Sequence, residues 1–302
     1  MATRFELVLH GQDQSSLRAA GEEAIAEIER LEDQLSLYRP SSEIAGLNAR
    51  AASGPVRVSP TLFGLLQHAQ LLHRETGGVF DITIAPLVRC WGFMGDSGRR
   101  PTPEEVAEAR AKVGMDLVCL DPDTLTVGFT RPGVMVDLGA IGKGYAIERA
   151  AEVLREAGVT SALLHGGTST VYALGHPPDA EFWQVALEQP PAALGAHTSL
   201  LPAVRLKDEA MSASAIWGRS FQADGKLFGH ILDPRTGQPA ENAVLAAVAL
   251  PSATETDALS TALLLSGSTG HSQLAGLRPG MRTFLMLGAN EGFRVEKLPL
   301  RD

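Results

Sequence analysis

The sequence is poor in cysteine and has no excess of basic residues. Only Cys90 and Cys119 occur among 302 residues, and no Cys-x-x-Cys spacing is present. Two cysteines make neither a disulfide framework nor a zinc pattern. We expect two packed, reduced thiols, with a single disulfide as the alternative. The formal net charge of −9 argues against a nucleic-acid or anionic-membrane surface, because both need clustered Lys and Arg.

Long apolar runs are also missing. No window approaches the roughly 18 uncharged apolar residues of a membrane helix, so no membrane insertion is expected. Residues 1–9 alternate like a strand and lack the apolar core of a secretory signal. The sequence therefore predicts a soluble, cytoplasmic protein. Its 44% hydrophobic and 20% charged residues are ordinary for a folded chain of this kind.

The apolar patterns mix helices with hairpins. Spacings of three and four residues over 15–35 predict an amphipathic helix that covers a sheet. Further helices are predicted at 61–76, 102–114 (with a capping box from Thr102 to Glu105), 144–157 and 254–266. Strands are predicted at 5–9, 117–120, 125–129, 134–138, 162–165, 171–174, 244–250, 283–287 and 293–295, a hairpin at 221–230 and a short turn at 44–47. This order favours an α+β fold with mixed or antiparallel sheets and flanking helices over a strict βαβ alternation.

A carboxylate and a hydroxyl fall on one face of the helix predicted at 254–266. Asp257 and Thr261 are four residues apart, so both oxygens project from the same side. A carboxylate with a hydroxyl and nearby helix-start carbonyls suits Mg²⁺ rather than zinc. The alternative is structural, because an aspartate in a first turn also stabilises a helix through its dipole.

A glycine-rich turn precedes another predicted helix. The segment Asp-Leu-Gly-Ala-Ile-Gly-Lys-Gly-Tyr covers residues 137–145. Its small residues let the backbone approach a ligand closely, and a helix N-terminus beside Lys143 suits phosphate oxygens. The spacing matches neither a Walker A loop nor Gly-x-Gly-x-x-Gly. A tight turn with a solvated lysine is the alternative interpretation.

Two more segments carry side chains suited to ligand contact. His230 lies on a predicted strand before the turn sequence Asp-Pro-Arg-Thr-Gly, and it could act as a general base near neutral pH. Residues 80–87, Phe-Asp-Ile-Thr-Ile-Ala-Pro-Leu, could present backbone amides and a hydroxyl, with Trp91 and Phe93 nearby. The alternatives are an unremarkable histidine among eight, and a buried strand with an aromatic core.

The order of the segments is more specific than any one of them. Leu-Ser-Leu-Tyr-Arg-Pro-Ser-Ser-Glu-Ile at 35–44 comes first, followed by the segments at 80–93, 137–145, 230–237 and 257–262. This series closely resembles that of the ApbE family of flavin transferases over nearly the whole chain. The resemblance implies an ApbE-like, T-fold-like architecture. Residues 1–302 would form a single domain, or two subdomains with the FAD and metal site between them.

The resemblance also implies roles for particular residues. The metal ligands would be the Asp257 carboxylate, the Thr261 hydroxyl and main-chain carbonyls at Ala140 and Ser260. His230 would deprotonate the acceptor, so the catalytic positions would be His230 and Asp257. The residues lining the FAD site would be Tyr38, Ile82, Thr83, Ile84, Lys143 and Ile231.

The activity implied by the resemblance is FAD:protein FMN transfer. Mg²⁺ would assist cleavage of the FAD pyrophosphate, FMN would pass to a threonine hydroxyl of an acceptor protein through a phosphoester, and AMP would leave. With water as acceptor, the same site would be an FAD pyrophosphatase. A third alternative is a non-catalytic FAD-binding protein.

The sequence departs from the family pattern at three places. Family members commonly have Thr-Ser-Gly-Asp-Tyr where residues 213–217 here read Ala-Ser-Ala-Ile-Trp. The acidic residue that usually follows the glycine pair is Thr168. The lipobox of exported relatives is missing from the sequence. These changes bear on transfer to a protein acceptor more than on FAD binding.

Overall fold

The structure is a computed structural model that describes residues 3–95, 98–191, 201, 203–289 and 292–298. The chain divides into two compact units. The first unit comprises Met1–Glu32, Ile141–Ala215 and Asn242–Asp302, and the second comprises Asp33–Ala140 and Ile216–Glu241.

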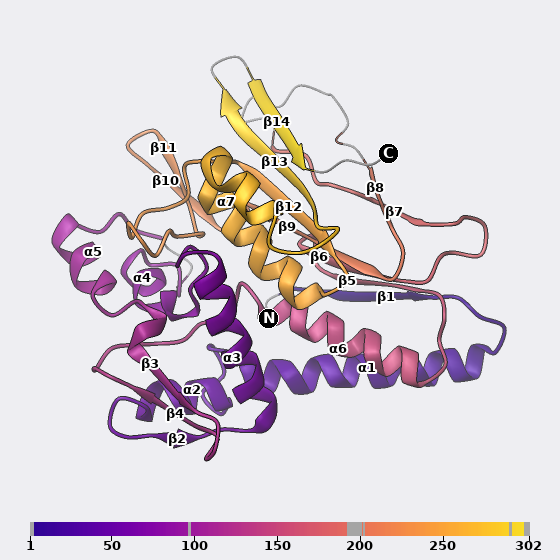
Figure 1. The fold of residues 1–302 in the computed structure, drawn as a ribbon, viewed down its shortest axis with the longest axis horizontal. Coiled ribbons are helices and arrows are strands. Elements are labelled where there is room, and N and C mark those ends of the chain that lie inside the picture. Colours follow the sequence, from indigo (N-terminus) through magenta and orange to yellow (C-terminus); the bar gives the residue numbers. More distant parts are fainter. Residues whose placement is uncertain (1–2, 96–97, 192–200, 202, 290–291, 299–302) are drawn as a thin grey trace. The chain divides into compact units, whose positions relative to one another are not determined.

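A seven-stranded sheet forms the frame of the first unit (Figure 1). Its order is β1-β5-β6-β9-β12-β13-β14, and every neighbouring pair is antiparallel. The strands are β1 Phe5–Leu9, β5 Ala162–Gly166, β6 Thr170–Leu174, β9 Glu209–Ala215, β12 Leu245–Leu250, β13 Arg282–Ala289 and β14 Gly292–Leu298. Strands β6 and β12 are buried at every position, which indicates that both of their faces are covered. A separate pair joins β7 Trp183–Ala186 to β8 Ala203–Leu206.

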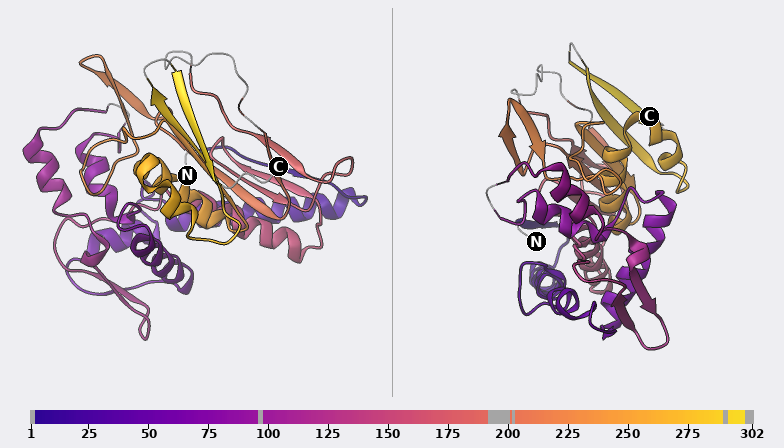
Figure 2. Two further views of the ribbon diagram at one scale, coloured as in Figure 1. Left: turned by 45° about the horizontal axis from the view of Figure 1, so that its top comes forward. Right: turned by 90° about the vertical axis from the view of Figure 1, so that its left-hand side faces the viewer.

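Among the described residues, three helices belong to this unit: α1 Gln14–Leu35, whose last residues lead into the second unit, α6 Gly142–Glu156 and α7 Ala253–Ala275. Helix α6 packs on β5 and β6, α7 packs on β9 and β12, and the two helices contact each other on the same face. Helix α1 runs alongside α6 in Figure 1 and in the left-hand view of Figure 2. Its buried residues Ala20, Ala24, Ile28, Leu31 and Leu35 follow the helical stripe predicted from the sequence.

The described part of the second unit consists mainly of helices, together with one small sheet and a separate two-stranded hairpin. The helices are α2 Glu43–Arg50, α3 Pro60–Glu75, the 3₁₀ turn η1 Ile82–Ile84, α4 Ala85–Cys90, α5 Pro103–Arg110 and the 3₁₀ turn η2 Met115–Leu117. The sheet has the order β2 Val56–Arg57, β4 Thr126–Phe129 and β3 Val118–Asp121, and β10 Ser220–Ala223 pairs with β11 Lys226–Gly229. The capping box predicted at the start of α5 is confirmed.

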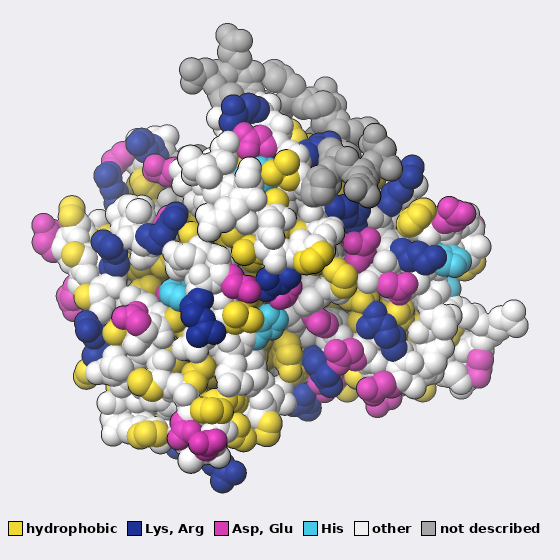
Figure 3. Space-filling model, in the orientation of Figure 1, with side chains coloured by type: hydrophobic (Ala, Val, Ile, Leu, Met, Phe, Trp, Pro, Cys, Tyr) yellow, Lys and Arg dark blue, Asp and Glu magenta, His cyan; other side chains and the backbone are white. Residues whose placement is uncertain are grey.

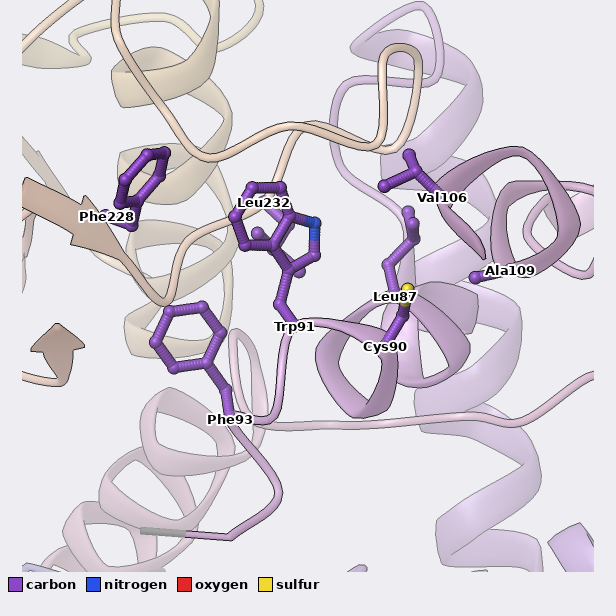
Figure 4. Packing of buried hydrophobic residues seen from close by; sticks show 8 residues of the cluster. All are labelled: Leu87, Cys90, Trp91, Phe93, Val106, Ala109, Phe228 and Leu232. Atoms are coloured by element: carbon purple, nitrogen blue, oxygen red, sulfur yellow. The ribbon is translucent and has the colours of Figure 1, made fainter. Parts of the chain in front are cut away.

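An aromatic cluster forms part of the core of the second unit (Figure 4). The Trp91 ring lies 5.6 Å from that of Phe228, and the Trp91 indole N–H donates to the carbonyl of Gly237 at 2.8 Å. The other members shown are Leu87, Cys90, Phe93, Val106, Ala109 and Leu232. Because the cluster joins α4 and α5 to residues 228–237, it fixes the segment that contains His230.

Three predicted elements differ in the structure. Residues 134–138 are not a strand, because the Asn48 side chain takes the place of a neighbouring strand. Its amide group donates to the Val136 carbonyl at 2.9 Å and accepts from the Val136 N–H at 2.8 Å. The predicted turn at 44–47 lies inside α2, which Ser42 caps. A strand within 80–87 is also wrong, since η1 and the start of α4 occupy that segment.

The fold is α+β with antiparallel sheets, as predicted. Both cysteines are free, but only Cys90 is buried, where burial raises its pKa. Cys119 is exposed on β3, so the expectation of two packed thiols is wrong for this residue.

No helix in the described part of the chain has the length and apolarity needed to cross a membrane. Basic and acidic side chains are interspersed on the face shown in Figure 3.

Candidate functional site

Two of the predicted motifs meet at the carboxylate of Asp257 in the first unit. This side chain lies on α7 and is 5% exposed. The Nζ atom of Lys143 lies 3.3 Å from its Oδ1, and the backbone N–H of Gly144 donates to its Oδ2 at 3.0 Å. Two motifs that are more than a hundred residues apart in sequence therefore share one buried carboxylate.

Glycine at position 144 permits this contact. A Cβ atom there would overlap the carbonyl oxygen of Ala253 and would lie 2.8 Å from the Cβ of Asp257. Glu148, one turn further along α6, anchors the start of α7. Its carboxylate accepts from the Ser252 hydroxyl at 2.8 Å and from the Thr254 N–H at 2.7 Å. The first turns of both helices are thus held in contact around Asp257.

A line of hydroxyls, here called the hydroxyl seam, joins β9 to α7, and all of its members except the partly exposed Thr261 are buried. Ser212 Oγ lies 2.8 Å from Thr256 Oγ1, and Ser214 Oγ lies 2.9 Å from Ser260 Oγ and 3.1 Å from Thr261 Oγ1. The seam fits because two residues of a strand advance about 6.6 Å, close to the roughly 6 Å of four helical residues. Sequence reasoning missed Ser212 and Ser214, because the strand that carries them, Glu-Ala-Met-Ser-Ala-Ser-Ala, lacks the residues typical of strands.

The oxygen atoms around Asp257 fit a hard divalent cation. One carboxylate and the Thr261 hydroxyl are ligand types that Mg²⁺ takes, and the hydroxyls of Ser260 and Thr261 both donate to the main-chain carbonyl of Asp257, at 3.0 Å and 3.4 Å. Among the described residues, no group of three or more His, Cys, Asp or Glu side chains is placed to hold a metal. Ala140, the remaining predicted ligand, is partly exposed and lies three residues before Lys143, at the end of a segment of the second unit.

His230 occupies a defined orientation in the second unit. Its Nδ1 lies 3.1 Å from the carbonyl oxygen of Arg219. Because a carbonyl can only accept, Nδ1 must donate, and neutral His230 therefore carries its lone pair on Nε2. The Phe93 ring lies edge-on at 6.5 Å, and the Arg219 guanidinium donates to the Phe93 carbonyl at 2.7 Å. The β10–β11 hairpin and the aromatic cluster together hold the imidazole in place.

The turn after His230 is closed by its own side chains. The carboxylate of Asp233 accepts from the backbone N–H of Arg235 at 2.8 Å and from its guanidinium at 2.7 Å. The carbonyl of Ile231 accepts from the N–H of Ala240 at 2.8 Å. The turn predicted from composition is confirmed. The ion pair between Asp233 and Arg235 stabilises the backbone conformation beside Ile231.

The predicted flavin-site segment at 82–84 is mostly buried. The Thr83 side chain was expected to offer a hydroxyl to a ligand, but the residue is 0% exposed. Its N–H and its hydroxyl both donate to Oδ1 of Asp81, at 2.7 Å and 2.5 Å. Ile82 is buried as well, whereas Ile84 is partly exposed. Thr83 therefore fixes the turn, and Ile84 is the member of this segment that reaches the surface.

Tyr38 is the most exposed of the predicted residues. It is 55% exposed in the loop that links α1 to α2. That loop is held in place by Ser42, whose hydroxyl donates to the carbonyl of Ser36 at 2.6 Å.

A cavity of about 420 Å³ in the first unit is lined by none of the predicted residues. Its lining residues are Asn242, Ser266, Ser268, Thr269, Leu287, Gly288 and Arg294.

Comparison with known proteins gives a consistent result. The sequence profile of the ApbE family matches residues 1–285. The FAD:protein FMN transferase of Haemophilus influenzae is 29% identical over 93% of this chain and 83% of its own length. The enzyme of the same name from Vibrio cholerae is 31% identical over 80% of this chain and 71% of its own length.

A solved structure agrees with the sequence relatives. The crystal structure of the ApbE protein from Thermotoga maritima superposes with a TM-score of 0.87 at 27% identity. The superposition covers 98% of this chain and 93% of the other. With its Asp257-centred cluster, its antiparallel frame and a profile match that spans nearly its whole length, the chain belongs to the ApbE family.

Proposed function

We propose that this chain is a Mg²⁺-dependent FAD:protein FMN transferase. It cleaves the pyrophosphate of FAD, joins FMN through a phosphoester to a threonine hydroxyl of an acceptor protein, and releases AMP. One observation carries the proposal: in a member of the ApbE family, Lys143 and Gly144 meet the carboxylate of Asp257, and the hydroxyl of Thr261, one turn further along α7, donates to the main-chain carbonyl of Asp257. The names of the curated relatives, FAD:protein FMN transferase, support the same activity.

The cluster at Asp257 is suited to phosphate chemistry. Mg²⁺ would be held by the carboxylate of Asp257, the hydroxyl of Thr261 and the carbonyls of Ala140 and Ser260. When bound, it would offset the negative charge that develops on the pyrophosphate oxygens. Lys143 adds a second positive charge, on the first turn of α6, where the backbone N–H groups also favour an anion.

His230 supplies the base in this proposal. Its Nε2 takes the proton from the threonine hydroxyl of the acceptor. The threonine oxygen then forms a bond to the FMN-side phosphorus, and the bond from that phosphorus to the bridging oxygen breaks. AMP leaves with the bonding electron pair. The Nδ1 contact with Arg219 stabilises the protonated imidazole, because the carbonyl accepts from a positively charged donor.

The flavin ring would rest on apolar and aromatic side chains. Tyr38, Ile84 and Ile231 are exposed or partly exposed, so they can contact an isoalloxazine ring. Ile82 and Thr83 are buried, and we assign them to the support of that surface.

Hydrolysis of FAD to FMN and AMP is a second candidate. The observation that favours it is the sequence at 215–217, Ala-Ile-Trp, which lacks the glycine and the acidic residue of the family pattern. Water would then replace the threonine hydroxyl as the nucleophile.

The proposed function is tested by following flavin onto a protein. The purified chain is incubated with FAD, Mg²⁺ and a threonine-bearing acceptor domain, and covalent flavin is detected by its fluorescence in a denaturing gel. We expect a fluorescent acceptor with wild-type protein and none with Asp257→Ala. Release of AMP without labelling supports the hydrolase, and tight FAD binding without any product supports a non-catalytic protein.

A further inference from the structure

We propose that His73 is a positioning residue for the flavin site. It lies on the last turn of α3 and acts through Asp81 on the η1 turn at Ile82–Ile84. No contact between His73 and flavin is required. The inference rests on the proposed function for its link to FAD, but the contacts that carry it are independent of that function.

The imidazole of His73 donates through a single nitrogen. Its Nδ1 lies 3.0 Å from the carbonyl oxygen of Phe80 and 3.2 Å from Oδ2 of Asp81. Both partners accept hydrogen bonds, so Nδ1 holds a proton whether the ring is neutral or charged. The nitrogen that titrates is therefore Nε2. The His73 side chain is 22% exposed, which leaves the ring within reach of water.

The other oxygen of Asp81 fixes the turn that follows. Oδ1 accepts from the N–H and the hydroxyl of Thr83, and the Thr83 hydroxyl in turn accepts from the N–H of Gly114 at 2.7 Å. The Asp81 side chain is only 2% exposed. We name His73, Asp81, Thr83 and Gly114 the Asp81 network. Each oxygen of this buried carboxylate has donors, and His73 is the partner on Oδ2.

The turn held by the Asp81 network leads to the glycine-rich motif. The carbonyl of Ile82 accepts from the N–H of Asp137 at 2.7 Å. Residue 137 begins the segment that ends with Ala140 and runs into α6. A shift of Asp81 would therefore be transmitted both to Ile84, which belongs to the proposed flavin surface, and to the backbone that carries a proposed metal ligand.

The charge on His73 strengthens this arrangement. A buried carboxylate without a partner is destabilised by the loss of water, and a positive neighbour offsets that cost. Asp81 is the main cause of the raised pKa of His73, Asp116 and the Phe80 carbonyl act in the same direction, and burial opposes them. The ring is charged below this raised pKa. As the pH rises through it, the charge is lost and only the Nδ1 hydrogen bonds remain.

Two substitutions distinguish the effect of the Nδ1 hydrogen-bond donor of His73 from the effect of its positive charge. In His73→Asn, the side-chain amide keeps a donor near the Nδ1 position but never carries a charge. In His73→Leu, both are lost. His68→Asn, on the same helix, is the matched control. The affinity for FAD is measured by quenching of flavin fluorescence over a pH range that extends well above the ordinary histidine pKa of about 6.5, because the pKa of His73 is raised by Asp81.

We expect His73→Leu to weaken FAD binding by about tenfold, since losing one partner of a charge-assisted hydrogen bond has an effect of that order. His73→Asn should keep most of the affinity at high pH but lose the gain that wild type shows at low pH. Wild-type affinity in His73→Leu, or a wild-type pH response in His73→Asn, would overturn the proposal. If His73→Leu does not fold, the pH dependence of FAD affinity in His73→Asn alone tests the proposal.

A second measurement does not depend on FAD. Hydrogen exchange at the N–H groups of Thr83 and Gly114 should be faster in His73→Leu than in wild type and nearly unchanged in His73→Asn. By NMR, Asp81→Asn should lower the pKa of His73. If wild type fails to bind FAD while these results hold, the proposed function is wrong and the Asp81 network stands. If the exchange rates at Thr83 and Gly114 do not change in His73→Leu, and the pKa of His73 does not change in Asp81→Asn, His73 has no positioning role.

Discussion

The ammonium group of Lys143 lies 3.3 Å from Oδ1 of Asp257, while the N–H of the next residue, Gly144, donates to Oδ2 at 3.0 Å. One carboxylate thus receives a positive charge and a backbone hydrogen bond from the start of α6. A divalent cation bound at Asp257 would share this carboxylate with Lys143, and the two positive charges would repel each other. Occupancy by metal and the position of Lys143 are therefore expected to be coupled.

Lys143→Met should raise the affinity of the FAD-free protein for Mg²⁺. Removal of the ammonium group relieves repulsion worth up to about 1 kcal/mol for a partly exposed pair, which is roughly a fivefold change in Kd. The same substitution should weaken FAD binding, because a positive charge near the phosphates is lost. Calorimetric titration with Mg²⁺ measures the first effect. Lys112→Met, which removes a surface ion pair with Glu108, is the control. Equal Mg²⁺ affinities in wild type, Lys143→Met and Lys112→Met would refute the coupling.

Gly144→Ala should destabilise the fold. The added methyl group would overlap the carbonyl of Ala253, so α6 and α7 must move apart, at a cost of about 1–3 kcal/mol. Gly64→Ala is the matched control, since Gly64 lies exposed on α3 with open space around its Cβ position. That substitution should stabilise by about 0.5–1 kcal/mol. Denaturant unfolding measures both, and equal effects would show that the close approach at residue 144 has no energetic role.

Ser214→Ala should affect metal binding as well as stability. The Ser214 hydroxyl contacts both Ser260 and Thr261, so its loss should reduce the free energy of unfolding by about 1 kcal/mol and leave Thr261 less well oriented. Ser212→Ala, on the same strand, removes the contact with Thr256 instead. We expect similar stabilities for the two variants but weaker Mg²⁺ binding only in Ser214→Ala. Identical Mg²⁺ affinities would remove Ser214 from the site.

His230→Ala should reduce flavin transfer without preventing FAD binding. Removal of a general base commonly lowers the rate by about 10²–10⁴, whereas the FAD surface would keep Tyr38, Ile84 and Ile231. The transfer rate and the Kd for FAD are measured on the same preparation, with His176→Ala, at an exposed histidine outside the site, as the control. A transfer rate that does not fall would exclude His230 as the base.

The motifs were readable from the sequence because their residues lie at the starts of helices or in tight turns. The spacing of Asp257 and Thr261, the capping box of α5 and the Asp-Pro-Arg-Thr-Gly turn all depend on local geometry. Their predicted structures are confirmed. The order of the motifs was enough to identify the family.

Long-range contacts were not readable in the same way. Strand β9 was missed because its sequence, Glu-Ala-Met-Ser-Ala-Ser-Ala, lacks the β-branched and aromatic residues typical of strands. The strand forms because small residues fit between β6, β12 and α7. The predicted strand at 134–138 was wrong because its backbone is paired by the Asn48 side chain, a contact that no local pattern indicates.

The most direct test of the central claim is the release of AMP from FAD, resolved by chromatography, with and without Mg²⁺ and with and without a threonine-bearing acceptor. We predict AMP only when FAD, Mg²⁺ and acceptor are all present, in amounts equal to the flavin bound to the acceptor, and none from Asp257→Ala. AMP release at the same rate in the presence of a chelator, or no AMP under any condition, would contradict a magnesium-dependent FMN transferase.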